Sequence, residues 1–312
     1  MKDRIIILGS NGQIGTELAI ALRQKHGVDQ VLTADIHVPQ DEPVNFKQVD
    51  VLDKTALKNL FESYKPTQVY LLAALLSAVG EQYPKKAWEL NMNGLLNVLD
   101  LAVEYKISRI FWPSSIAVFG PNSPTSDTPQ YCVMDPNTVY GISKLAGEQW
   151  CAYYALKYGL DIRSIRYPGL ISWKAAPGGG TTDYAIHIFI EALKHKRYTC
   201  FLSENTRLPM LYMEDAIQGT ISLMEAPAEH LNIHSSYNLT GISFTPKELA
   251  LEIKRHIPDF HIDYKVDEVR QGIADSWPDT IDDQYARQDW NWTPRYTLEN
   301  MTKDMLKNLK NK

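Results

Sequence analysis

The stretch Ile5-Ile6-Ile7-Leu8-Gly9-Ser10-Asn11-Gly12-Gln13-Ile14-Gly15 decides the fold of this 312-residue chain. Its four apolar residues end at a glycine, which is typical of a strand buried on both faces of a parallel sheet. The glycines that follow open a helix, which we expect over 12–26. Gly9 permits a tight turn, Gly12 lets a pyrophosphate approach the backbone at the helix N-terminus, and Gly15 allows close packing of the helix on the strand. The pattern predicts a dinucleotide site, although a purely structural turn could use the same spacing.

Asp35 strengthens this interpretation, because it ends the next expected strand 20 residues past Gly15. A carboxylate at that position accepts hydrogen bonds from the adenosine ribose and repels a 2′-phosphate, which favours NAD over NADP. A turn cap is the alternative role for Asp35. The other residues expected along the cofactor come from the glycine loop and the strand ends, and the small apolar ones could equally serve packing: Gln13, Ile14, Asp50, Val51, Leu72, Ala73 and Ala74.

Similar apolar runs recur through about the first 170 residues, and stretches of helical pattern separate them. We expect strands at 31–34, 69–73, 110–112 and 162–165, and helices at 53–63, 84–105 and 137–158. Strands that alternate with helices in this way indicate βαβ units. The sequence therefore predicts an α/β fold of the Rossmann type, with a doubly wound parallel sheet.

The pattern loosens after residue 174, where prolines punctuate shorter elements. We expect an NAD-binding domain over 1–174 and a smaller substrate-binding lobe over 175–312, partly interleaved with the first. A glycine-rich loop at 177–180 precedes a helix expected over 182–196, and residues 238–241 are typical of a strand end and a turn. Thr245 followed by Pro246 predicts another helix start, because threonine caps helices and proline suits their first position.

Composition excludes several classes of protein. Lys and Arg number 32 against 37 Asp and Glu, a net charge of −5, so a basic surface for nucleic acid or an anionic membrane is missing. Cys132, Cys151 and Cys200 are scattered and the eight histidines show no ligand spacing, which argues against a disulfide framework and against a bound metal. The apolar run at 5–8 is too short to span a membrane or act as a signal segment. We expect a cytoplasmic protein.

Tyr140 and Lys144 are four residues apart in the helix expected over 137–158, so their side chains share one face. Tyrosine, with an ordinary pKa of about 10, is a poor base at neutral pH, but an adjacent ammonium group and a nicotinamide cation would stabilise its phenolate. Tyr140 could then accept a hydroxyl proton while hydride leaves the same carbon. Ser114 and Ser115 end a strand at the ligand-binding edge and could donate to the developing carbonyl. A surface pair and strand-end caps are the alternatives.

Together these residues resemble the extended short-chain dehydrogenase/reductase superfamily over nearly the whole chain. The similarity is carried by the glycine motif at 9–15, Asp35, the segment 91–94, the two serines and the Tyr140/Lys144 pair. The resemblance implies that Lys144 also holds the nicotinamide ribose and that Asn91 helps to organise a helix and a proton-relay water. Segments 213–216 and 290–294 resemble the structural C-terminal signatures of the group.

A narrower resemblance follows the expected strand at 162–165. Tyr167-Pro168-Gly169-Leu170-Ile171-Ser172 and Pro177-Gly178-Gly179-Gly180-Thr181-Thr182-Asp183-Tyr184 are similar to the short-chain type of L-threonine 3-dehydrogenase. Pro168 stands where many enzymes of nucleotide sugars carry an asparagine. The resemblance implies NAD-dependent oxidation of the L-threonine 3-hydroxyl to 2-amino-3-oxobutanoate, without a metal.

The same resemblance places Ser77, Thr182 and Trp277 at the substrate, and Tyr167, Pro168 and Leu170 beside the cofactor. Gly180, Thr181 and Thr182 open a helix, where hydroxyls and amides suit a carboxylate, and Asp183 could face an ammonium group. The alternatives are an ordinary N-cap cluster at 181–183 and a packing role for Trp277. The glycines of this loop could also form a hinge that lets it close over the site.

Two other functions stay open: a nucleotide-sugar epimerase or dehydratase on the same scaffold, and a non-catalytic NAD-binding protein. We expect a homodimer that pairs through the helices at 84–105 and 137–158, because both carry more apolar residues than one sheet face requires. Packing within the chain is the alternative for these residues, which are Leu95, Leu96, Leu99, Trp150, Tyr153 and Tyr154. A β-keto acid product would couple the chain functionally to a coenzyme A-dependent lyase.

Overall fold

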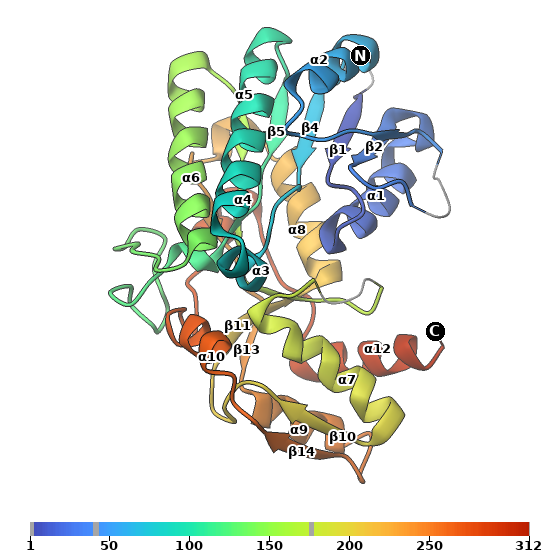
Figure 1. Ribbon diagram of the computed structural model, residues 1–312, viewed down its shortest axis with the longest axis vertical. Helices are drawn as coiled ribbons and strands as arrows, with labels where there is room; N and C mark the ends of the chain where they lie inside the picture. Colours follow the sequence, from blue (N-terminus) through green and yellow to red (C-terminus); the bar gives the residue numbers. More distant parts are fainter. Residues whose placement is uncertain (1–2, 40–43, 175–177, 312) are drawn as a thin grey trace.

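The computed structural model describes residues 3–39, 44–174 and 178–311, which form a lobe around a parallel sheet and a smaller lobe beneath it (Figure 1). The sheet has the strand order β3-β2-β1-β4-β5-β7. Its strands are β1 (Ile5–Leu8), β2 (Val31–Asp35), β3 (Phe46–Gln48), β4 (Gln68–Leu71), β5 (Arg109–Phe111) and β7 (Ile162–Arg163). β1 pairs with both β2 and β4, so the direction of winding reverses there. Open α/β sheets bind ligands beside such a reversal, at the carboxyl ends of the strands.

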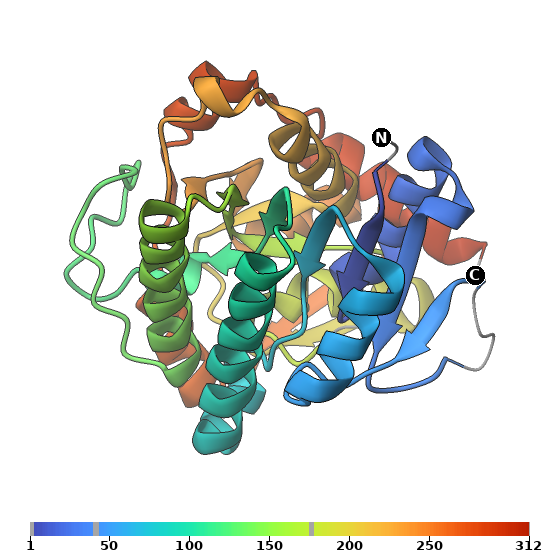
Figure 2. The same ribbon diagram turned by 90° about the horizontal axis from the view of Figure 1, so that it is seen from above.

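Helices cover both faces of this sheet (Figure 2). They are α1 (Gln13–His26), α2 (Lys54–Tyr64), α5 (Gly94–Glu104), α6 (Val139–Tyr158) and α8 (Met213–Glu225). β1, β2 and β4 are buried along most of their length, as the continuous apolar runs require, whereas the edge strand β3 is exposed at two of its three residues. The predicted doubly wound α/β fold is confirmed.

The helix expected over 84–105 is interrupted in its middle. α4 (Pro84–Trp88) passes into a π-helical segment, Glu89–Asn93, before α5 continues. Single π-helical turns inside longer helices often serve a function. Here the turn carries Asn91, whose side chain bonds the backbone of Leu75 in the loop after β4. The short helix α3 (Ser77–Gln82), which the sequence pattern did not predict, follows that loop.

The strand expected over 162–165 is divided, and that prediction was wrong in its details. β7 stops at Arg163, and β8 (Ile165–Tyr167) pairs instead with β6 (Ser114–Ser115) and β12 (Tyr237–Asn238). The neighbouring strand is broken in the same way, since Pro113 separates β5 from β6 and has no N–H to donate to a ladder. These two breaks bend the chain out of the central sheet and bring Ser114 and Ser115 toward the smaller lobe.

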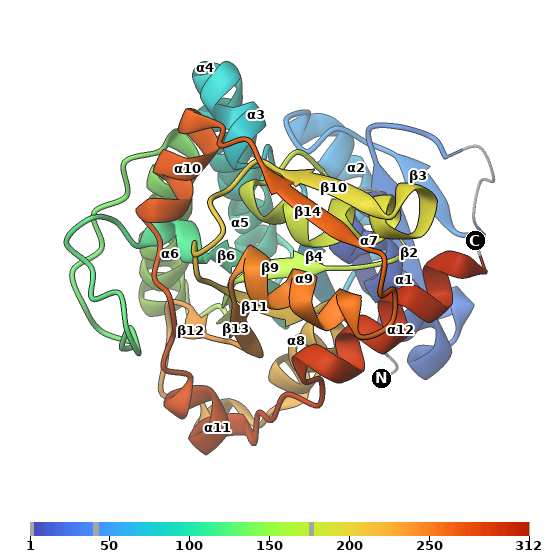
Figure 3. The same cartoon turned by 90° about the horizontal axis from the view of Figure 1, so that it is seen from below.

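The smaller lobe is built on two further sheets, shown from below in Figure 3. β9 (Gly169–Ile171), β11 (Leu208–Tyr212) and β13 (Ile242–Phe244) form one, and β10 (Arg197–Cys200) and β14 (His261–Tyr264) form the other. A 3₁₀ turn at Thr181–Asp183 leads into α7 (Tyr184–His195), and α9 (Pro246–Lys254), α10 (Glu268–Asp275) and α12 (Leu298–Lys310) complete the lobe. The predicted helix start is confirmed, because Thr245 and Glu248 cap α9 reciprocally.

Parts of the second half of the chain return to the first lobe. Apolar residues of α8 pack with those of α1, and α11 (Gln284–Trp290) adds Trp290 to the same cluster. The domain boundary at residue 174 stays a prediction. The three cysteines are free, as expected. Within the described ranges, no helix is long and apolar enough to cross a membrane.

Candidate active site

Two adjoining cavities run along the carboxyl ends of β1, β2 and β4. One has a volume of about 260 Å³ and lies between the lobes. The other, of about 240 Å³, lies over the ends of β1 and β2. Both are lined by Gly9, Gly12, Leu72 and Ala74, so they form one continuous groove. We call the first the reacting end and the second the adenosine end.

The glycine loop shapes the middle of this groove. Gly9 has a φ of +85°, and a Cβ there would lie 2.5 Å from the backbone nitrogen of Ala73. A Cβ on Gly15 would lie 2.5 Å from the carbonyl oxygen of Gly9. At Gly12, by contrast, the nearest atom would be 3.6 Å away. Two glycines thus make the turn tight, while the third leaves the N-terminus of α1 accessible, which fits a pyrophosphate.

Asp35 lies at the adenosine end, where β2 stops. Its Oδ2 accepts a hydrogen bond from the Asn11 amide at 3.0 Å, and its Oδ1 accepts one from the His37 amide at 3.2 Å. Val51 and Ala73 line the same cavity. Asp35 therefore caps the turn and faces the groove at once, so its two alternative roles are compatible.

Two of the expected cofactor residues do not line either cavity. Asp50 is exposed, and its carboxylate accepts a hydrogen bond from the Leu52 amide at 2.9 Å. Asn91 is buried: its Oδ1 accepts from the Leu75 amide at 2.9 Å, and its Nδ2 donates to the Leu75 carbonyl and to Ser143 Oγ. Asn91 joins the loop after β4 to α6. This contact fits the organising role implied for Asn91, and both of its amide hydrogens are already used.

Tyr140 and Lys144 lie on the first turns of α6 and line the reacting end. Lys144 is 3% exposed, and its Nζ donates to the Pro113 carbonyl at 2.6 Å and lies 4.5 Å from the centroid of the Trp112 ring. The Tyr140 hydroxyl is hydrogen-bonded to Ser115. The helix begins at the Thr138 cap, so Tyr140 and Lys144 are placed by local sequence and the serines by the bent strand.

Burial shifts both pKa values away from their ordinary ranges. Desolvation raises the pKa of Tyr140 to about 12, although the bond with Ser115 opposes the shift. Desolvation also lowers the pKa of Lys144 to about 7. For these residues by themselves, desolvation therefore outweighs any lowering of the tyrosine pKa by the neighbouring lysine. The physical reason is that the ammonium group is directed at Pro113, 5.6 Å from the Tyr140 ring centroid, and burial outweighs it.

The two serines have different surroundings. Ser114 is 2% exposed, lines the reacting end, and donates its hydroxyl hydrogen to Glu148 at 2.6 Å. Ser115 Oγ accepts from the Ala117 amide at 3.2 Å and bonds to Tyr140. The expectation that both serines donate to a developing carbonyl is thus not met by Ser114, because its single hydrogen is already used.

The residues expected at the substrate also line the reacting end: Ser77 from α3, and Gly180, Thr181, Thr182, Asp183 and Trp277 from the second half of the chain. Thr181 is 1% exposed, and its hydroxyl has no hydrogen-bond partner. Asp183 Oδ2 accepts from the amides of Gly179 and Gly180, both at 2.8 Å, so this carboxylate holds the loop at 178–180. Trp277 also packs in the core of the smaller lobe. Pro177 of that loop lies outside the described residues.

The rest of the reacting end comes from both expected and unexpected positions. Gln13, Ile14, Tyr167, Pro168 and Leu170 line it as expected. Leu76, Pro113 and Gly178 line it too and were not predicted. Two of these three follow β4 and β5 at their carboxyl ends, so the rule that ligands bind there could have found them. Among the described residues, no group of three His, Cys, Asp or Glu side chains could hold a metal ion.

Comparison with known proteins places this geometry in a family. The model of the NAD-dependent epimerase/dehydratase family matches residues 5–239. An uncharacterized epimerase/dehydratase of Staphylococcus haemolyticus is 48% identical over 314 residues, covering 99% of this chain and 98% of the relative.

Two solved structures are similar over nearly their whole length. An L-threonine dehydrogenase from Cupriavidus necator in its holo form shares 54% identity at a TM-score of 0.95, covering 98% of this chain and 99% of that one. A monomeric L-threonine 3-dehydrogenase from a metagenome shares 47% identity at a TM-score of 0.96, with the same coverage of 98% and 99%. The predicted superfamily and the predicted cofactor NAD are confirmed. The chain belongs to the NAD-dependent epimerase/dehydratase family.

Proposed function

We propose that this protein oxidises L-threonine at its 3-hydroxyl, with NAD as the oxidant, to 2-amino-3-oxobutanoate, NADH and a proton. The observation that carries the proposal is the pair of facing walls at the reacting end. One wall presents the Tyr140 hydroxyl bonded to Ser115, and the other presents the buried, unpartnered hydroxyl of Thr181. An alcohol and a carboxylate separated by two carbons fit such a pair of walls.

Each wall has a defined chemical task. Tyr140 takes the proton of the substrate hydroxyl, and Ser115 polarises the same oxygen. Lys144 holds the nicotinamide ribose and keeps positive charge near the phenolate. Bound NAD would supply the hydride acceptor for Cβ of the substrate. Since burial raises the pKa of Tyr140, the positive charge of a bound nicotinamide ring would help to ionise the tyrosine.

The substrate carboxylate is met by the start of the helix at 181–195. Thr181 and Thr182 supply hydroxyls beside the backbone amides of the 3₁₀ turn, where the helix dipole also favours an anion. Ser77 and Trp277 close the cavity around the substrate. The loop at 178–180, which Asp183 holds through two backbone hydrogen bonds, covers this end and excludes water during hydride transfer.

The direct test is production of NADH by the purified protein with L-threonine. Binding of nucleotide sugars serves as the contrasting arm, because the same family includes enzymes named epimerase and dehydratase. Threonine-dependent NADH formation, with no thermal stabilisation by UDP-sugars or dTDP-sugars, supports the proposal. Stabilisation by a nucleotide sugar without threonine oxidation would favour the epimerase or dehydratase. If the protein shows neither response, a non-catalytic NAD-binding protein is favoured.

We also propose that two copies pair through the outer face of α6. Leu156 is 89% exposed and Tyr153 is 44% exposed on that helix, where they form an apolar face with Trp150. Leu95 and Leu99 are fully buried against the sheet. The expectation that they take part in the interface is therefore wrong, and they pack within the chain instead. Sedimentation of the wild type and of Leu156→Lys tests this pairing, and a wild-type monomer at micromolar concentration would exclude it.

The setting of the reaction is also a proposal. Three free cysteines without a disulfide suit the reducing cytoplasm. The product is a β-keto acid, which loses carbon dioxide readily. A coenzyme A-dependent lyase that takes 2-amino-3-oxobutanoate directly would therefore be its functional partner.

A further inference from the structure

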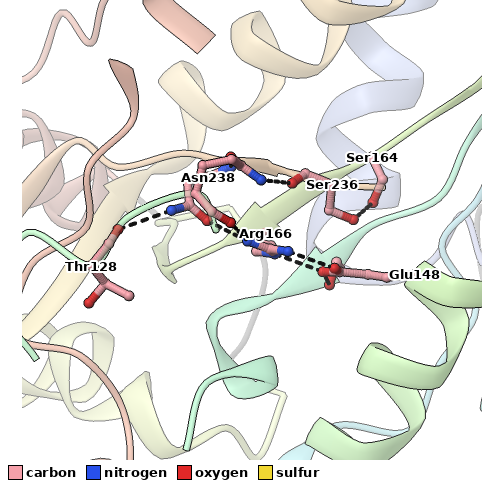
Figure 4. A network of polar contacts seen from close by, with 8 residues as sticks. Thr128, Glu148, Ser164, Arg166, Ser236 and Asn238 are labelled. Atoms are coloured by element: carbon pink, nitrogen blue, oxygen red, sulfur yellow. Dashed lines mark hydrogen bonds and ion pairs between the residues drawn. The ribbon is translucent and has the colours of Figure 1, made fainter. Parts of the chain in front are cut away.

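A buried ion pair lies directly behind the catalytic wall. Glu148 is one helical turn beyond Lys144 on α6, and its carboxylate accepts two hydrogen bonds from Arg166, at 2.9 and 2.8 Å (Figure 4). Glu148 is 0% exposed and Arg166 is 2% exposed. Charges this deeply buried persist only when they are paired and hydrogen-bonded. The pair therefore defines one fixed arrangement of the groups around it.

The remaining donors of Arg166 tie this pair to distant segments. Its Nη1 donates to the Gln130 carbonyl at 2.9 Å and to Asn238 Oδ1 at 3.0 Å. The side-chain amide of Asn238 in turn donates to the Thr128 carbonyl at 3.1 Å (Figure 4). The guanidinium is thus held from both sides and cannot turn away from Glu148.

The third hydrogen bond that Glu148 accepts comes from Ser114. A serine hydroxyl has one hydrogen and two lone pairs. Because Ser114 donates that hydrogen to Glu148 at 2.6 Å, its oxygen offers only lone pairs to the reacting end that it lines. An ionised carboxylate accepts but never donates, so Glu148 leaves Ser114 no other orientation.

We infer that Ser114 is a hydrogen-bond acceptor for the ammonium group of the substrate, and that the Glu148–Arg166 ion pair is the positioning device that keeps it an acceptor. This inference rests on the proposed function. Ser114 is not a second oxyanion donor beside Ser115 but the residue that selects alcohols carrying a neighbouring amine.

Ser114 differs from the other hydroxyls that line the cavity, because its only hydrogen is already donated and it can act solely as an acceptor. Tyr140, which lies beside Ser115, lines the cavity and suits the reacting hydroxyl, and Thr181 lines it too and suits the carboxylate. Asp183 was the acceptor expected from the sequence, but its Oδ2 already accepts hydrogen bonds from the backbone amides of Gly179 and Gly180. A protonated amine donates strongly to a fixed lone pair such as that of Ser114.

Ser114→Ala is the first test, because it removes the acceptor and leaves the ion pair intact. We expect KM for L-threonine to rise about tenfold or more, as for a lost hydrogen bond to a charged group, with kcat within about twofold. The effect should disappear for 3-hydroxybutyrate, which lacks the amine, measured as a substrate or as a competitive inhibitor. An unchanged KM for threonine, or an equal loss for both ligands, overturns the inference.

The second test shows whether the ion pair acts through Ser114. In Glu148→Met/Arg166→Met, apolar side chains of similar length replace the pair, a kind of change that folded proteins often tolerate. We expect the same rise in KM, and no further rise when Ser114→Ala is added. A full additional effect of Ser114→Ala in that background would show that the pair has only a structural role. If the double variant does not fold, the Ser114→Ala comparison still decides the ammonium contact.

Ser236→Ala is the matched control. Ser236 belongs to the same polar network, but its hydroxyl bonds Ser164 and does not line the reacting end (Figure 4). It should leave KM for threonine unchanged, and a rise equal to that of Ser114→Ala would contradict a specific role for Ser114. A wild-type protein that forms no NADH with threonine would instead refute the proposed function and this inference with it.

Discussion

The two ends of the groove are built in different ways. At the adenosine end, Asp35 is held by amides of the adjoining loops and stays partly exposed. At the reacting end, Lys144 and Ser114 are buried, and their partners, the Pro113 carbonyl and Glu148 of α6, lie 31 and 34 residues away in the sequence. Binding a nucleoside needs only a correctly shaped edge, whereas proton transfer needs groups whose pKa values and hydrogen positions are controlled.

This difference predicts that substitutions at the reacting end alter turnover and pH dependence, while those at the adenosine end alter only cofactor affinity. Burial is the physical reason, since electrostatic interactions are stronger away from water and an unpaired group there costs more. The following substitutions test that division, beginning with the largest expected effect.

Tyr140→Phe should lower kcat for L-threonine about 10²–10⁴-fold, the contribution expected of a positioned acid or base. The phenol lines only the reacting end, so the dissociation constant for NADH should stay within about twofold of the wild type. NADH formation and fluorescence titration measure the two quantities. A rate close to that of the wild type would refute the role of Tyr140.

Lys144→Met should abolish most of the activity and yet stabilise the fold at neutral pH. The pKa of Lys144 is lowered to about 7 in the folded protein, whereas in the unfolded chain it stays near its ordinary value of 10.5. Between these values the unfolded state binds more protons, so wild-type stability rises with pH by about 1.4 kcal/mol per pH unit from this residue.

Urea unfolding between pH 7 and pH 9 measures that slope. Lys144→Met removes the titrating group, so its free energy of unfolding should be less dependent on pH than that of the wild type. The same slope in both proteins would contradict the lowered pKa of Lys144 and would show that a nearby charge compensates for its burial.

Asp35→Ala should weaken NAD binding about tenfold to a hundredfold, because hydrogen bonds to a charged group contribute roughly 1.5–3 kcal/mol. Discrimination against NADP should relax at the same time, since the repelling charge is gone. The kcat at saturating NAD should change little. A large fall in kcat would mean that the two ends of the groove are not separate in function.

Asp50→Ala should have the smallest effect, with NADH affinity and kcat within about twofold of the wild type, as for most surface substitutions. Asp50 is exposed, and its carboxylate accepts a hydrogen bond from the local Leu52 amide. It is the matched control for Asp35→Ala. A clear loss of NADH affinity would restore the place along the cofactor that the sequence suggested for Asp50.

The adenosine end was predictable because its determinants are local. The glycine spacing at 9–15, the run before it and Asp35 all lie within one βαβ unit, and each is explained by the geometry of that unit. The reacting end was predictable only in part. Tyr140 and Lys144 follow from helical spacing, but the hydrogen bond from Ser114 to Glu148 crosses 34 residues and depends on a strand break at Pro113.

The sequence by itself determined the doubly wound fold, the glycine turn that shapes the groove and the helical spacing of Tyr140 and Lys144. Short-range periodicity, glycine conformations and helical spacing encode these features, and they need no distant partner. Only the tertiary structure decided which serine keeps a free hydrogen, that Asp183 holds a loop, and that burial raises the pKa of Tyr140. Those properties depend on solvent exclusion and on contacts between distant segments, which no local pattern contains.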